Sequence, residues 1–161
     1  MDLRRLRPGE WIAALSGVAL LVSLFLPWYG GGAEGDASGW EALAAVDIAL
    51  ALVAAFGVSL LVITAAQRVP AVPIALSAIV TLVGLIGVVL MLIRVANMPD
   101  GFDGRKLGVW LGMLAAIGIV AGASLAMRDE RLSPEGSHTD LTGRPAPAPP
   151  EIERIPAPRG E

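Results

Sequence analysis

Four long stretches of the chain carry no charged side chain, and apolar residues dominate each of them. A helix rises about 1.5 Å per residue, so about 20 apolar residues are needed to cross a hydrocarbon core of roughly 30 Å. A soluble four-helix bundle would instead show a polar stripe along each helix, and these stretches have none. The pattern predicts four membrane-spanning helices. The uncharged stretches are 11–33, 48–67, 69–93 and 107–127.

Turn and capping residues set the expected limits of the helices. Pro27 and the glycines after Tyr29 end the first span, and Ser38 with Glu41 has the spacing of a capping box at the start of the second helix. The predicted fold is all-α: a four-helix transmembrane bundle with up-down-up-down topology. Its spans are 11–29, 43–66, 72–96 and 107–127. The other segments are a basic cytoplasmic N-terminus (1–10), an outer loop with the start of the second helix (30–42), an inner hairpin (67–71), an outer loop (97–106) and a tail (128–161).

The tail is rich in proline, glycine and charge, which favours an extended, disordered chain over a packed fold. The prolines of 144–150 could dock on an aromatic groove of a partner, or the tail could be a solvated tether. At the other end, the basic start and Gly31-Gly-Ala33 could also belong to a cleaved signal peptide. An apolar run with Trp11 and Trp28 at its two ends is more typical of an anchored span.

Basic residues near the span ends predict the orientation of the chain. Cytoplasmic loops of membrane proteins carry the excess of Lys and Arg, so the richer side should face the cytoplasm, together with both termini. We expect a plasma-membrane location, the inner membrane of a bacterium, with aromatic residues marking the two boundaries. The richer side receives Arg4, Arg5, Arg7, Arg68, Arg128 and Arg131, and the other side receives Arg94, Arg105 and Lys106.

The amino-acid composition supports a membrane protein and argues against several classes of function. Hydrophobic residues make up 55% of the 161 positions and charged residues 17%, with a mean hydropathy of +0.67, as expected for a membrane protein. The chain has no cysteine, and its one histidine, His138, falls in the tail. These facts predict no metal site, no cofactor and no cysteine or serine–histidine catalysis. No basic surface suggests a nucleic-acid partner.

Small residues at four-residue spacing mark places where membrane helices approach closely. We expect them to pack the four helices within one chain, with homodimerisation through the fourth helix as the alternative. The spacing occurs in the second helix at Ala51, Ala55 and Ser59. The fourth helix carries Gly104, Gly108, Gly112, Gly118 and Gly122.

Asp47 and Arg94 are the candidate functional pair. Both lie 20-odd residues from the shared inner hairpin on neighbouring helices, so they should reach similar heights near the outer boundary. Ionisable groups at membrane depth are paired, snorkel to the headgroups or serve a function. A structural ion pair and a ligand site therefore both remain open. The aromatic residues expected around the pair are Trp28, Tyr29, Trp40 and Trp110.

The middle of the spans offers no charged group for a proton relay or ion pathway. Its polar residues all carry hydroxyl groups: Ser16, Ser59, Thr64, Ser77, Thr81 and Ser124. We therefore expect a non-enzymatic protein of structural or interaction type, such as an accessory subunit or envelope sensor, with the bilayer and a membrane protein or a second copy as partners. The alternative is a small transporter or carrier that uses the region of Asp47 and Arg94.

The sequence 24–29, Leu-Phe-Leu-Pro-Trp-Tyr, is followed by Ser-Gly-Trp-Glu-Ala at 38–42 and by Asp47. This arrangement resembles a group of small four-span bacterial membrane proteins. The likeness covers residues 10–128 and leaves out the tail. It implies a fold and a location, and it carries over no activity and no catalytic residue.

Overall fold

The computed structural model describes residues 6, 8–31, 35–42, 45–66 and 71–131. Most of the predicted inner hairpin and nearly all of the predicted tail lie outside these residues. The elements follow in the order α1 (Pro8–Ser23), β1 (Pro27–Gly30), β2 (Ala37–Ser38), α2 (Gly39–Ala42), α3 (Ala45–Ala66), α4 (Ala71–Ala96), β3 (Gly104–Arg105) and α5 (Leu107–Arg131).

The described part of the chain is mostly helical, and three of its helices are long and apolar enough to cross a membrane. They are α3, the segment Ala75–Ala96 of α4 and the segment Leu107–Arg128 of α5, each 22 residues long. Helix α1 is also apolar but has only 16 residues. Large apolar side chains cover the outside of the helices: Leu82, Leu107 and Leu114 are 63%, 70% and 68% exposed. Such a surface suits lipid rather than water, as in a membrane protein.

The first helix ends earlier than the sequence suggested. Helix α1 stops at Ser23, and a tight turn follows in which the N–H of Leu26 donates to the carbonyl of Ser23 over 3.1 Å. Proline has no N–H to continue the helix and disfavours helical backbone at the preceding residue. Pro27 thus starts strand β1, and the predicted helical limit at Tyr29 is wrong.

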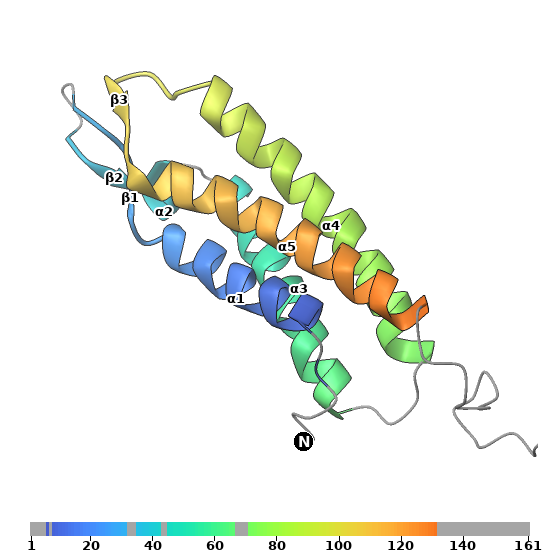
Figure 1. The fold of residues 1–161 in the computed structure, drawn as a ribbon. Helices are drawn as coiled ribbons and strands as arrows, with labels where there is room; N and C mark the ends of the chain where they lie inside the picture. Colours follow the sequence, from blue (N-terminus) through green and yellow to red (C-terminus); the bar gives the residue numbers. More distant parts are fainter. Residues whose placement is uncertain (1–5, 7, 32–34, 43–44, 67–70, 132–161) are drawn as a thin grey trace, which may run out of the picture.

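A small antiparallel sheet accompanies the helices of this mostly helical fold. Its strand order is β2-β1-β3, with Tyr29 of β1 opposite Ala37 on one side and Arg105 on the other. Figure 1 shows the sheet at one end of the helices, away from the start of α1 at Pro8. We call this end the sheet end and the opposite end, where α1 begins, the inner end. The sheet joins two loops that are far apart in the sequence.

Helix α1 packs against α5 and α3, and α4 packs against the same two helices. The α1–α5 contact is a contact between backbones. A Cβ on Gly122 of α5 would collide with the backbone N of Ala13, and a Cβ on Gly9 would collide with the backbone N of Ala126. Since Gly9 meets Ala126 and Ala13 meets Gly122, the two helices run in opposite directions.

We predict that Gly122→Ala destabilises the protein by about 1–3 kcal/mol, because the added methyl group must push α1 away from α5. The matched control is Gly104→Ala, since among the described residues a Cβ there would come within 4 Å of the carbonyl oxygen of Gly30 alone, at 3.9 Å. Thermal unfolding of both variants in detergent measures the difference. Equal melting temperatures for the two variants would contradict the close α1–α5 contact.

Candidate functional site

Trp28 is the anchor of the sheet end. Its side chain is completely buried, and its indole N–H donates to the carbonyl of Ser23 over 2.6 Å. The ring lies against two glycines of α5: a Cβ on Gly108 would collide with Cδ1 of Trp28, and one on Gly112 would lie 3.2 Å from Cζ2. The backbone N–H of Lys106 donates to the carbonyl of Trp28 over 2.8 Å. Trp28 thus fixes both the end of α1 and the start of α5.

Tyr29, the next residue, ties the sheet to α4. It is completely buried, its hydroxyl donates to the carbonyl of Arg94 over 2.9 Å, and its ring centroid lies 5.7 Å from that of Phe102. Burial raises the pKa of the Tyr29 phenol, and the positive charges of Arg94 and Arg105 oppose the shift in part. The phenol is therefore held neutral and serves as a hydrogen-bond donor.

The four candidate aromatic residues do not line one pocket. Trp28 and Tyr29 are core residues, whereas Trp40 and Trp110 are 36% and 51% exposed. Trp40 packs on the surface ring of Phe25, with the centroids 5.7 Å apart. Trp28 and Tyr29 therefore contact the protein interior, whereas Trp40 and Trp110 have exposed rings.

Asp47 and Arg94 belong to the ends of α3 and α4 at the sheet end. Asp47 is buried in the first turn of α3, where the helix dipole favours a negative charge, and its carboxylate accepts the N–H of Ile48 over 2.6 Å. Lys106 and Asp36 form an ion pair at this end, with Lys106 Nζ 3.0 Å from Asp36 Oδ1. Both side chains are about half exposed, so this pair adds little stability.

The glutamate half of the predicted capping box is observed at the start of α2. A carboxylate oxygen of Glu41 accepts both the backbone N–H and the hydroxyl of Ser38, each over 2.8 Å. These two hydrogen bonds lower the pKa of the exposed Glu41 carboxyl. Glu41 is therefore a structural residue at the start of α2, between α1 and α3.

The glycines of α5 pack within the chain. Gly108 and Gly112 hold Trp28, a Cβ on Gly118 would collide with the side chain of Ser16, and Gly122 meets Ala13. Gly104 does not belong to this series, because it lies in strand β3 and not in a helix.

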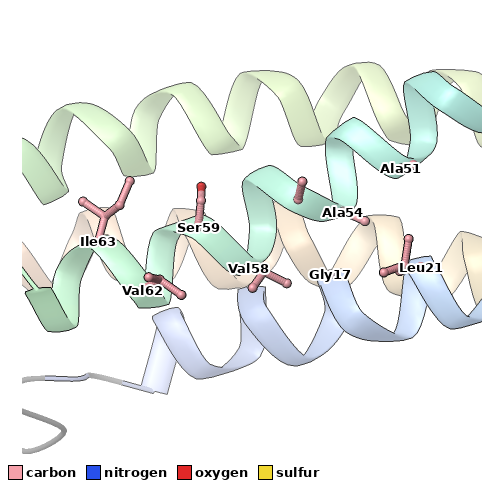
Figure 2. A pocket seen from close by; sticks show the side chains of 9 residues that line it. Gly17, Leu21, Ala51, Ala54, Val58, Ser59, Val62 and Ile63 are labelled. Carbon is pink, nitrogen blue, oxygen red and sulfur yellow. The ribbon is translucent and has the colours of Figure 1, made fainter. Parts of the chain in front are cut away.

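A groove of about 460 Å³ lies between α1 and α3, away from the candidate pair. Figure 2 shows Gly17 and Leu21 of α1 facing α3, with Val58, Ser59 and Val62 along the α3 side. The lining is almost entirely apolar and includes three small residues of α3, at positions four apart. These residues are Ala51, Ala55 and Ser59.

One buried charged residue was missed by the reasoning from sequence. Glu10, placed in the predicted cytoplasmic N-terminus 1–10, lies in the first turn of α1 and is only 2% exposed. Its seven-residue spacing from Gly17, which meets α3, could have indicated that it shares the packed face of α1.

Comparisons with family models, with curated proteins and with solved structures match nothing to this chain. The geometry described above is therefore the basis for the function proposed below.

We predict that Tyr29 titrates above its ordinary pKa of 10.0. Because the folded-state pKa is raised, its contribution to stability is complete below about pH 10 and is lost as pH rises through the folded pKa. Tyr29 is the one tyrosine of the chain, so the ultraviolet absorbance of the phenolate reports it directly. Tyr29→Phe should remove the signal and cost about 0.5–1.5 kcal/mol through the lost hydrogen bond to Arg94. A titration at or below the ordinary value would refute the buried position.

Proposed function

We propose that this chain is a four-span protein of the bacterial inner membrane, with both termini in the cytoplasm. We further propose that it works without enzymatic activity, by binding another membrane protein as an accessory subunit or envelope sensor. The apolar surface of the helices supports the location, and the groove between α1 and α3 supports the mode of action.

The surface of α1 supports a fourth span. Its outward side chains are large and apolar: Leu15 is 63% exposed and Val18 is 50% exposed, and Phe25 in the following turn is 67% exposed. Sixteen residues give about 24 Å of helix, and the apolar turn after Ser23 adds length at the sheet end. Exposed Trp11, near the start of α1, is suited to the interface on the other side.

The distribution of basic residues supports the orientation. The sheet end carries Arg94, Arg105 and Lys106, of which Lys106 is partly neutralised by Asp36. In the sequence, Arg4, Arg5 and Arg7 precede the first residue of α1, and Arg128 and Arg131 are among the last residues of α5, so more basic residues fall beside the opposite end. Under the positive-inside rule the inner end faces the cytoplasm, and the sheet faces outward.

The groove between α1 and α3 is the observation that carries the proposed interaction. Membrane helices associate by close backbone approach at small residues, since lipid tails are as apolar as their side chains. Here Ala51, Ala55 and Ser59 line a groove that the chain's own helices leave open, whereas the glycines of α5 are already used inside the bundle. We expect a single transmembrane helix of another protein to pack against these three small residues in the groove.

Photo-crosslinking in living cells tests the interaction. A benzophenone amino acid at Val62, in the groove, should form an adduct of discrete mass with one membrane protein, which mass spectrometry then identifies. The same probe at Leu85, on the outer surface of α4 and 48% exposed, is the matched control and should form none.

Filling the groove should abolish that adduct. We predict that Ala55→Phe lowers the yield from the Val62 probe about tenfold or more, because the ring occupies the space needed for backbone approach. The variant's own melting temperature is the check on folding. Adducts with lipid alone, or an adduct unaffected by Ala55→Phe, would contradict the proposal. An adduct of twice the chain mass would show that the molecule bound in the groove is a second copy of this chain and not another protein.

A further inference from the structure

The groove between α1 and α3 has an almost entirely apolar lining. Of the described side chains that form it, Ser59 alone carries a polar group, and its hydroxyl donates to the carbonyl of Phe56 in its own helix over 2.8 Å. A bound water molecule needs several polar partners, and this lining does not supply them. The groove therefore requires an apolar occupant whenever no partner helix is bound.

The length and volume of the groove match a single hydrocarbon chain. Its lining runs along α3 from Ala51 to Ile63, which is about 18 Å of helix (Figure 2). A helix segment of this length, about 10 Å in diameter, occupies about 1,400 Å³, well above the groove volume of about 460 Å³. An extended hydrocarbon chain advances about 1.25 Å per carbon, so about 14 carbons span the groove. At roughly 30 Å³ per methylene group, close to the volume of a water molecule, these carbons occupy about 420 Å³.

The groove lies nearer to the inner end of α3 than to its sheet end. Ile63 lies three residues from the inner end of α3, whereas Ala51 lies six residues from the other end. The chain passes from α1 to α3 at the sheet end, where the N–H of Trp40 in α2 donates to the carbonyl of Leu24 over 3.4 Å. At the inner end α1 begins and α3 leads on to α4, so no direct connection between α1 and α3 crosses that end. A lipid of the leaflet at the inner end can therefore place one chain in the groove.

Positive charge at the inner end favours an anionic headgroup for such a lipid. Arg128 of α5 is exposed, and it follows by two residues Ala126, which meets Gly9 at the start of α1. In the sequence, Arg4 and Arg5 also precede α1. Basic residues beside a membrane surface attract anionic lipids. A lipid whose chain enters from this end leaves its headgroup there, so a negative headgroup complements the charge.

We infer that the groove between α1 and α3 binds one acyl chain of an anionic phospholipid from the leaflet at the inner end. The inference rests on the proposed membrane location and adds a regulatory step to the proposed function. The lipid chain and a partner helix need the same small-residue surface, formed by Ala51, Ala55 and Ser59. The partner helix therefore displaces the lipid when it binds.

Native mass spectrometry of the purified full chain tests the site, with phosphatidylglycerol that carries two palmitoyl chains added to the detergent. We expect saturable binding of one lipid per chain and a melting temperature that rises with lipid concentration. Phosphatidylglycerol with octanoyl chains should bind about tenfold more weakly, because it fills about half of the groove. Phosphatidylcholine with palmitoyl chains should also bind more weakly, because its headgroup has no net charge. The absence of saturable binding, or an equal affinity for either comparison lipid, would overturn the inference.

Ala55→Phe tests where the lipid binds. The ring fills the groove, so binding of the palmitoyl phosphatidylglycerol should fall about tenfold or more, and the lipid-dependent rise in melting temperature should be lost. The control is Leu85→Phe on the outer surface of α4, where the side chain is 48% exposed, and this variant should keep both properties. Unchanged lipid binding in Ala55→Phe would overturn the inference. The comparison of the three lipids uses the unmodified chain and does not depend on the folding of the variant.

The purified chain contains no partner protein, so lipid binding and the crosslinking experiment give independent results. Lipid binding without a protein adduct from the Val62 probe would support this inference and contradict the proposed partner. A protein adduct without lipid binding would overturn this inference and leave the proposed partner in place.

Discussion

The contact between α1 and α5 is the constraint on which the rest of the structure depends. Helix α1 is the shortest of the four apolar helices, and hydrophobic exclusion does not drive helices together in lipid. It is held by backbone contact: Gly9 lies against Ala126, and Gly122 lies against Ala13. This contact brings α1 and α5, the first and last helices, side by side and places Glu10 inside the protein. It also assigns the glycines of α5 to packing within one chain.

The opposite end of the same two helices is closed by Trp28. Because Pro27 stops the helix, the chain turns back over α5, and the indole fits against Gly108 and Gly112. The strand that results pairs with both β2 and β3, and Tyr29 extends the connection to α4. A short sheet can form here because its backbone groups lie outside the apolar helices, where loops and strand edges are permitted.

Sequence reasoning located the helices because a membrane leaves a strong signal: a spanning segment must be apolar and must satisfy its own backbone. It also found the contact of Ser38 with Glu41, which depends only on local spacing. It did not predict the burial of Trp28 and Tyr29, because aromatic residues near the end of a span are equally expected at the lipid interface and in the protein interior. It missed the burial of Glu10, since a charge beside a basic segment looks solvated until the position of α5 is known.

The central claim is that the short helix α1 crosses the membrane, so that its start and the sheet lie on opposite sides. Since the chain has no cysteine, single replacements can be labelled in intact cells with a membrane-impermeant thiol reagent and no background. We expect Ala33→Cys and Asp100→Cys to be labelled, and Asp2→Cys and Arg128→Cys to be labelled only after the cells are opened. Labelling of Asp2→Cys in intact cells, with Arg128→Cys still protected, would show that α1 does not cross and would contradict the four-span account.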